Sequence, residues 1–329
     1  MIKGKEILYL TKKDVEDVSL SMAELIEVMD EAYKEKGKGL YQLPPKSALH
    51  CYKHGDFIHT MPCYLKAHNA AGVKLVSGYS ENYKVNLPYI NGLYVLIDVE
   101  TGVPLAVMDC VWITTMRTGA MTGLSARYLA NPDSEVVGLI GTGVQGRSNI
   151  EALMVTMKNL KKLYCYDHFA ENAEKYANEI SKKYGIEVIA TKDTEKLVRE
   201  ADILLSAIPC AVDESQEFIK KEWFKDGLTA LPVDLGVLML PDALNDPWAR
   251  MYTDDQGQYN FFKGEGFFRS IPDTPPEIGK LFLGEIGGRK THDEKILAIN
   301  IGTGLADLAT ARRLYDSALK NNVGTILPL

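Results

Sequence analysis

Three glycines near the middle of the chain have the spacing G-x-G-x-x-G, which can cradle a pyrophosphate. The apolar run 136–140 leads directly into them, and an amphipathic helical pattern follows. In that context Gly141 permits a sharp turn, Gly143 lets the backbone approach the phosphates, and Gly146 lets the helix pack closely on the strand. We therefore predict a dinucleotide site at a helix N-terminus, where amide groups attract negative charge. The predicted cofactor loop consists of Gly141, Thr142, Gly143, Val144, Gln145 and Gly146.

An acidic residue follows the next predicted strand, 163–166. Asp167 has the spacing from the glycines at which dinucleotide-binding proteins place the acid that accepts a hydrogen bond from the ribose 2′-hydroxyl. A carboxylate there repels a 2′-phosphate, and the next residue, His168, is not the arginine that would bind one. The pair favours NAD(H) over NADP(H) as the cofactor.

Chemistry on a small substrate needs charged groups outside this loop, and four residues are candidates. Lys74 lies in an apolar, strand-like segment where a solvated lysine is not expected. Arg117 stands at the start of a helical run, where its planar guanidinium could bind a carboxylate through two hydrogen bonds. Asp234 ends another apolar strand, a position from which parallel sheets present residues to ligands. Lys46 is a weaker candidate, because a lysine after two prolines is more often an exposed loop residue.

The elements that must position these residues differ between two parts of the chain. Residues 47–108 form short apolar or alternating runs separated by Gly, Asn and Pro, which is typical of an antiparallel or mixed sheet. From residue 136 onward, strands alternate with helices. This alternation predicts an α/β fold with a Rossmann-type, doubly wound parallel sheet.

Local signals predict helices at both ends of the chain and a loop late in it. A capping-box pattern at Ser21 predicts a helix that ends near Gly37, and a second helix opens at 302–304. The segment 256–276 is rich in Gly, Phe and Pro, so we expect a loop there. The acidic pair 254–255 before it is expected to be a solvated strand end.

The composition of the 329 residues excludes several classes of protein. Lys and Arg number 37 against 44 Asp and Glu, and the net charge of −7 argues against a nucleic-acid binder or a polybasic membrane-surface protein. No apolar run of about 18 residues occurs, so we expect a cytoplasmic protein without a membrane span. The five cysteines include no C-x-x-C pair, and His50, His54 and His59 lack a completing ligand, so no metal is expected.

Eight segments in a fixed order resemble the ornithine cyclodeaminase/mu-crystallin family over nearly the whole chain. Any one of these segments is common, but the lysine, Arg-Thr-Gly and Rossmann motifs together are specific to that family. The segments are Pro44-Pro45-Lys46, Met61-Pro62, Gly72-Val73-Lys74, Met116 to Ala120, Gly141 to Gly146, Tyr166-Asp167, Asp234-Leu235-Gly236 and Gly302 to Asp307.

The resemblance implies roles for five residues. Arg117 resembles the family's carboxylate-binding arginine, and Lys74 the active-site lysine that contacts the carboxylate or the reacting carbon–nitrogen centre. Asp234 resembles the acid that handles the amino group or orients a water molecule. Thr118 falls where the family contacts the cofactor phosphates, and Thr303 where it lies near the nicotinamide amide.

The chain also departs from the family pattern around the substrate. Lys46 stands where the family has a second substrate arginine, so two-pronged binding is lost there. The cyclodeaminase branch tends to carry Glu just before its Met-Pro, whereas this chain has His59 and Met61 in that segment, which we keep as candidates for substrate contact. The family's Asp-x-Pro-Gly-Lys stretch is replaced at 234–239.

The same resemblance implies an architecture. Residues 1–128 with 303–329 are expected to form an α+β substrate-binding and dimerisation domain, and residues 129–302 the Rossmann domain. The strand-rich segment 47–108 is too short and too exposed at its edges to stand alone. We therefore expect it to be buried in a symmetric homodimer.

These features together predict an NAD(H)-dependent oxidoreductase that acts on the CH–NH or C=N bond of a small amino or imino acid. One alternative is an ornithine cyclodeaminase, which converts L-ornithine to L-proline and ammonia with catalytic NAD; the departures above weaken it. Another is a non-catalytic, mu-crystallin-like NAD(P)H-binding protein. The presence of Lys74, Arg117 and Asp234 argues against that second alternative.

Overall fold

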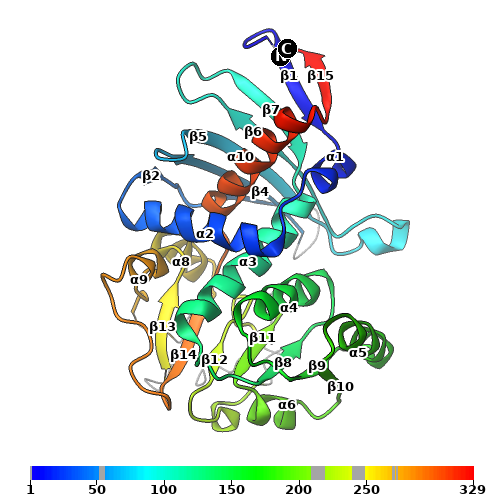
Figure 1. Ribbon diagram of the computed structural model, residues 1–329, viewed down its shortest axis with the longest axis vertical. Helices are drawn as coiled ribbons and strands as arrows, with labels where there is room; N and C mark the ends of the chain where they lie inside the picture. The colour runs from blue at the N-terminus through cyan, green and yellow to red at the C-terminus, as the bar shows by residue number, and fades with distance from the viewer. Residues whose placement is uncertain (1, 52–55, 209–218, 239–248, 269–270, 272) are drawn as a thin grey trace. The chain divides into compact units, whose positions relative to one another are not determined.

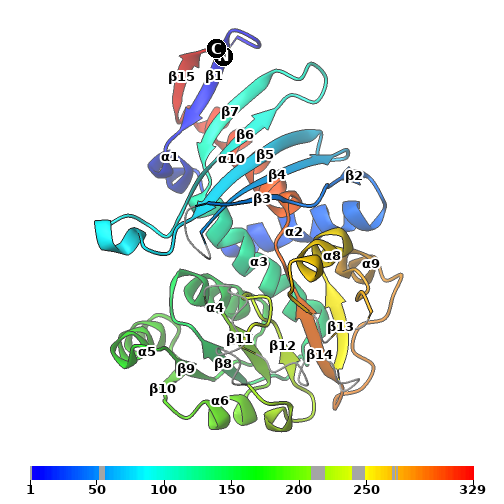
Figure 2. The same ribbon diagram turned by 180° about the vertical axis from the view of Figure 1, so that it is seen from behind.

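The computed structural model describes residues 2–51, 56–208, 219–238, 249–268, 271 and 273–329, which form two compact units (Figures 1 and 2). The first unit comprises Met1–Arg117 and Gly302–Leu329, and the second comprises Thr118–Ile301. The division falls within helix α3 (Val111–Leu129), between two adjacent residues, rather than at the end of that helix.

The first unit is built on an eight-stranded sheet with the order β15-β1-β7-β6-β5-β4-β2, in which β3 also pairs with β4. Neighbouring strands are antiparallel except for β1 and β7, so the predicted antiparallel or mixed sheet is confirmed. Its strands are β1 (Glu6–Leu10), β2 (Tyr41–Gln42), β3 (Ser47–His50), β4 (Phe57–Leu65), β5 (Ala70–Gly78), β6 (Ile90–Ile97), β7 (Pro104–Asp109) and β15 (Thr325–Pro328).

Two helices of the first unit lie on one face of this sheet. In α2 (Met22–Gly37) the side chains of Ser21 and Glu24 form the predicted capping box, which satisfies amide groups that a helix start leaves unpaired. Helix α10 (Gly304–Asn321) packs against β4, β5 and α2. The short elements α1 (Lys12–Asp17) and η1 (Asn82–Val85) and the start of α3 also belong to this unit.

Side chains on the central strands alternate between the helix-covered face and its opposite. On β5 the residues Gly72, Lys74 and Val76 are buried, whereas Leu75 between them is 47 % exposed. Leu93 on β6, which pairs with Leu75 on β5, is 42 % exposed. Figure 2 shows this second face of β3 to β7 turned toward the viewer, with α2 and α10 behind it. The first unit therefore presents apolar side chains on a face of its sheet that its own helices do not cover.

The second unit contains the predicted doubly wound parallel sheet, with seven strands in the order β10-β9-β8-β11-β12-β14-β13. The chain runs from β8 outward through β9 to β10, then returns to β11 on the other side of β8. Its strands are β8 (Val136–Ile140), β9 (Lys162–Tyr166), β10 (Glu187–Ala190), β11 (Ile203–Ser206), β12 (Thr229–Ala230), β13 (Ala249–Thr253) and β14 (Lys295–Ile299). Its helical elements besides the end of α3 are α4 (Val144–Thr156), α5 (Ala170–Tyr184), α6 (Thr194–Glu200), η3 (Lys221–Trp223), α8 (Gln256–Gly264) and α9 (Ile278–Phe282).

Two expectations about the late part of this unit are wrong. The segment expected to be a loop begins with the helix α8, whose N-cap Asp255 accepts a hydrogen bond from the Gln258 amide at 2.6 Å. Asp254 is fully buried rather than solvated, and its Oδ1 accepts the Ile301 amide at 3.0 Å. Both carboxylates serve as backbone hydrogen-bond acceptors, which the local sequence pattern did not indicate.

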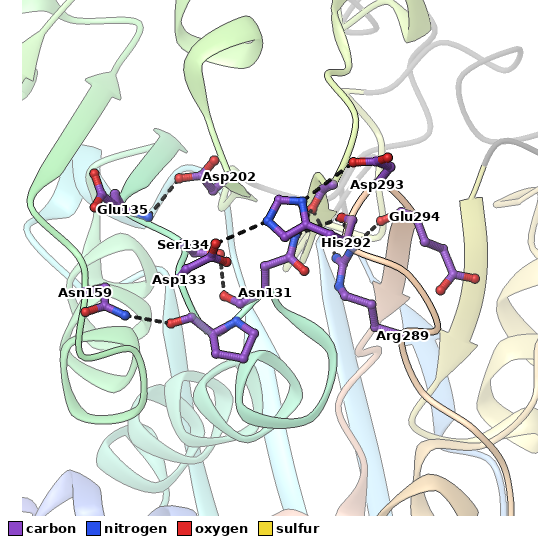
Figure 3. Close-up of polar contacts among 12 residues, drawn as sticks. Asn131, Asp133, Ser134, Glu135, Asn159, Asp202, Arg289, His292, Asp293 and Glu294 are labelled. Carbon is purple, nitrogen blue, oxygen red and sulfur yellow. Dashed lines mark hydrogen bonds and ion pairs between the residues drawn. The ribbon is translucent and has the colours of Figure 1, made fainter.

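Hydrogen bonds fasten the amino ends of the parallel strands (Figure 3). Asp202, just before β11, accepts the amides of Glu135 and Val136 at 2.8 Å each. Arg289 donates to the Leu129 carbonyl at 2.9 Å, and Asn131 donates to the His292 carbonyl at 3.0 Å. Because these contacts satisfy backbone groups, we interpret this edge as structural. Ligand-facing residues are expected at the opposite, carboxyl edge.

Candidate active site

The cofactor loop joins β8 to α4 in the second unit, at the carboxyl end of β8. Gly141 has a φ of +96°, and a Cβ there would lie 2.5 Å from the Ala207 carbonyl oxygen. A Cβ on Gly146 would lie 2.4 Å from the Gly141 carbonyl oxygen, so the start of α4 packs directly on the turn. Among the described atoms none lies within 4 Å of a Cβ built on Gly143, the N-cap of α4. The loop backbone thus packs tightly at Gly141 and Gly146. At Gly143 there is open space, where a phosphate would meet the helix amides.

Asp167 lies beside this loop at the end of β9. Its Oδ2 accepts hydrogen bonds from the Thr142 amide at 3.0 Å and the Thr142 hydroxyl at 2.7 Å, and its Oδ1 accepts the Phe169 amide at 3.1 Å. Burial acts to raise the pKa of Asp167, but these hydrogen bonds outweigh it and the pKa lies below its ordinary value. The side chain of Asn172 also acts to lower this pKa through a hydrogen bond. His168 is exposed.

Asp234 follows β12 in the same unit and is fully buried. Backbone pairing to β11 continues beyond β12, since the Val233 amide donates to the Ser206 carbonyl at 2.8 Å. The Ser206 hydroxyl and the Gly236 amide donate to Asp234 Oδ1 at 2.8 and 3.0 Å. Asp234 Oδ2 has no hydrogen-bond partner among the described residues. Burial raises the pKa of this carboxyl to about 6 despite those hydrogen bonds, so it can gain or lose a proton near neutral pH.

A second group of charged residues lies inside the first unit. Lys74 on β5 and Arg117 on α3 are 1 % and 8 % exposed, and the fully buried Asp307 on α10 contacts both. Lys74 Nζ lies 2.7 Å from Asp307 Oδ2, and Arg117 Nε lies 3.1 Å from Asp307 Oδ1. Two cations that the sequence predicted separately are therefore joined by one carboxylate. Asp307 occurs in a segment that carries the family resemblance, but no local signal marked it as a site residue.

The remaining substrate candidates lie near this cluster. Met61 is buried and pairs with Lys74 across β4 and β5. Burial, together with the charges of Lys46, Lys74 and His50, lowers the pKa of His59 to about 3, so its ring is neutral at pH 7. Lys46 is buried, and the expectation of an exposed loop lysine is wrong. The first unit thus places Met61 beside Lys74, and the charges of Lys46 and Lys74 both act on His59.

The two threonines assigned to the cofactor have different surroundings. Thr118 is the first residue of the second unit and is partly exposed. Thr303 is fully buried in the first unit, where its hydroxyl lies 3.1 Å from the hydroxyl of Tyr33. Contacts of Thr118 with phosphates and of Thr303 with a nicotinamide stay predictions.

No helix in the described ranges is long and apolar enough to cross a membrane. No three His, Cys, Asp or Glu side chains in that part of the chain are grouped to hold a metal ion. His54, one of the three histidines considered above, lies outside the described residues.

Comparison with known proteins places this chain in a family. The ornithine cyclodeaminase/mu-crystallin family pattern matches residues 5–322. An alanine dehydrogenase of Archaeoglobus fulgidus is 31 % identical over 328 residues, covering 97 % of this chain and 98 % of that protein. A solved structure of Thermococcus litoralis Δ1-pyrroline-2-carboxylate reductase, in complex with NADH and L-proline, is 32 % identical with a TM-score of 0.85 and covers 97 % of this chain and 99 % of its own. An archaeal alanine dehydrogenase dimer with bound NAD is 29 % identical, also with a TM-score of 0.85, over 98 % and 99 % of the two chains. This chain therefore belongs to the ornithine cyclodeaminase/mu-crystallin family.

Proposed function

We propose that this protein is an NAD(H)-dependent oxidoreductase that acts on the CH–NH or C=N bond of a small amino or imino acid. The observation that carries the proposal is the buried pair of cations, Lys74 and Arg117, in a chain that also has an open dinucleotide loop. A buried cation is costly unless an anion accompanies it, so two of them sharing one carboxylate suit an anionic ligand. The relatives named above are a dehydrogenase of an amino acid and a reductase of a cyclic imino acid.

The residues of the second unit suit NAD(H). The open space at Gly143 and the N-terminus of α4 would receive the pyrophosphate, and Asp167 would accept the ribose 2′-hydroxyl. The ionised Asp167 beside an exposed His168 supports a preference for NAD(H) over NADP(H). When bound, this cofactor supplies or accepts the hydride.

The chain's own residues supply binding and proton transfer. Arg117 and Lys74 hold the substrate carboxylate, with Lys46, His59 and Met61 near it. Oxidation of an amine requires a neutral nitrogen, so a base must take its proton first. Asp234 is our choice for that base, because its pKa of about 6 lets it accept a proton and release it at neutral pH.

We further propose that the protein works as a homodimer. Leu75 and Leu93 are exposed on the face of the first unit's sheet that its helices do not cover. A second copy of the chain would supply a matching apolar face that buries them. One of the related structures is a dimer.

The experiment that tests the proposed reaction is a screen of NADH oxidation. Pyruvate with ammonia, other 2-oxo acids with simple amines, and Δ1-pyrroline-2-carboxylate are offered as substrates, beside an assay of L-proline formation from L-ornithine. We expect NADH-dependent reduction of at least one imino acid. Proline formation without net NADH oxidation would favour the cyclodeaminase instead, and NADH binding with no turnover of any substrate would favour the binding protein.

A further inference from the structure

Asp307 has a position that the motifs do not explain, because it lies within the first unit between two cations. Each oxygen of its carboxylate meets a different partner: Oδ2 meets Lys74 Nζ at 2.7 Å, and Oδ1 meets Arg117 Nε at 3.1 Å. The hydrogen bond between Arg117 and Asp307 uses Nε, so it does not occupy the two terminal nitrogens of the guanidinium. Those two nitrogens can bind a carboxylate through parallel hydrogen bonds.

The start of α10 is shaped to hold this arrangement. Asp307 lies in the first turn of the helix, where the helix dipole favours a negative charge. Gly302, with a φ of +85°, lies against the guanidinium, and a Cβ there would be 2.4 Å from Arg117 Nη1. A Cβ on Gly304 would lie 2.9 Å from the Met61 carbonyl oxygen, so the helix begins close to β4. The backbone thus brings the carboxylate to the cations and leaves room for the guanidinium plane.

The charges in the cluster do not cancel. With Lys74 in its ammonium form, Lys74 and Arg117 carry two positive charges against the one negative charge of Asp307. Burial lowers the pKa of Lys74 and the neighbouring Arg117 lowers it further, while Asp307 acts to raise it. Without Asp307, the lysine would lose the anion that favours its ammonium form. With Asp307, one positive charge is left over, which suits a ligand with a single carboxylate.

We propose that Asp307 is a positioning residue that holds Lys74 and Arg117 in one rigid receptor for the substrate carboxylate and stabilises the ammonium form of Lys74. This inference rests on the proposed function for the role of the two cations. It adds that their geometry and charge depend on a third residue, which itself makes no contact with the substrate.

The pH dependence of this receptor is set by the groups around Lys74. Tyr94 pairs with Lys74 across β5 and β6, and burial raises the pKa of its hydroxyl well above the ordinary value, so it stays neutral. Burial raises the pKa of the Cys110 thiol to about 12, and His59 is neutral. The titratable and charged groups that face Lys74 are Asp307 from α10, Arg117 from α3, Cys110 from the end of β7, Tyr94 from β6 and His59 from β4. Asp307 is therefore the one carboxyl group of this set.

The test compares Asp307→Asn, which keeps the shape of the side chain and removes its charge, with Asp307→Glu, which keeps the charge and lengthens the side chain by one methylene group. Asp316→Asn is the matched control, because Asp316 lies on the same helix in an exposed ion pair with Arg312. The substrate is whichever of pyruvate plus ammonia and Δ1-pyrroline-2-carboxylate is reduced. We expect Asp307→Asn to lower kcat/KM about a hundredfold, mainly through KM, as misplacement of a binding group by about 1 Å can do. NADH affinity, measured by fluorescence, should stay within about twofold.

The pH profile separates positioning from a merely structural role. In Asp307→Asn the alkaline limb of kcat/KM should move to lower pH, because Lys74 loses its proton more easily. In Asp307→Glu the limb should stay near that of the parent protein even though the rate falls. An unmoved limb in Asp307→Asn, or a kcat/KM within about threefold of the parent, would overturn the proposal.

A measurement without turnover keeps this inference distinct from the proposed function. Lysine labelled with ¹³C at Cε reports the titration of Lys74 by NMR, with Lys74→Met used to assign the signal. Asp307→Asn should shift that titration to lower pH whether or not a substrate has been found, and an unshifted titration contradicts the inference. If Lys74→Met and Arg117→Lys retain full turnover while the titration shifts, the proposed function fails and the charge coupling stands.

Discussion

Replacing Asp234 by asparagine should make the protein both more stable and less active at pH 8. A pKa of about 6 in place of the ordinary 3.8 means that ionising this buried carboxyl costs the folded state about 3 kcal/mol at pH 8. The sign follows from the raised pKa: the folded state holds the proton more tightly than the unfolded state. The cost is therefore complete above pH 6 and disappears as the pH falls toward 4.

The asparagine removes this cost but adds a smaller one. Its oxygen can still accept from Ser206 and Gly236, while its NH₂ group takes the place of Oδ2, which has no partner among the described residues. An unpaired buried donor costs about 1–2 kcal/mol, so the net gain in the free energy of unfolding should be about 1–2 kcal/mol at pH 8. By the same arithmetic, the variant and the parent should be about equally stable at pH 5. Loss of a general base should lower turnover by about 10²–10⁴.

Thermal unfolding followed by circular dichroism at pH 8 and pH 5 checks the predicted change in stability. NADH oxidation at pH 8 checks the predicted loss of turnover. Asp202→Asn is the control: burial acts to raise the pKa of Asp202, but hydrogen bonds from Lys225 and from the Glu135 and Val136 amides outweigh it and the pKa is lowered. This control should lose stability at pH 8 and keep its activity per folded molecule. If Asp234→Asn unfolds at a lower temperature than the parent at pH 8, or turns over at the parental rate, the reasoning about its burial and role is refuted.

Three further predictions concern the cofactor, the receptor and the assembly. NADH should bind more tightly than NADPH, and Asp167→Ala should narrow the difference in fluorescence titrations; equal affinities in the parent would contradict this. Gly302→Ala places a Cβ 2.4 Å from Arg117 Nη1 and should lower kcat/KM about a hundredfold, whereas Gly39→Ala, at a similar φ of +72° with open space around it, should affect stability alone. Leu75→Glu should turn a dimer into a monomer in light scattering, and a parent protein that is already monomeric at micromolar concentration would rule out the dimer.

Sequence patterns located the elements with strong local signals. The capping box of Ser21 and Glu24 predicts α2 with its correct start, because the two side chains satisfy neighbouring amides without help from the rest of the fold. The glycine loop and its strand are equally local. Around helix α8 the sequence is rich in Gly, Phe and Pro, which suggests a loop, and the start of the helix depends on the side chain of Asp255, two residues after β13.

The candidate site was only partly predictable for a related reason. Lys74 is predictable as a site residue because a lysine in an apolar strand needs a compensating charge. Its partner, Asp307, lies more than two hundred positions further along the chain and meets it only because α10 folds back onto β5. No periodicity or spacing encodes that contact. The burial of Lys46 is likewise a consequence of packing within the first unit and cannot be read from the two prolines before it.

The two buried centres of this protein differ in their charged partners, and each arrangement suits one half of an amino acid. Around Lys74, a carboxylate is fixed between two cations and one positive charge remains, which favours an incoming anion. At Asp234, burial without a cation among its hydrogen-bond partners favours the neutral acid, so this carboxyl can take up a proton near pH 6. An amino acid presents both an anion to be bound and an ammonium proton to be removed before its C–N bond is oxidised. A purely structural ion pair would explain the first centre but not the second, and this difference is why we favour catalysis over mere cofactor binding.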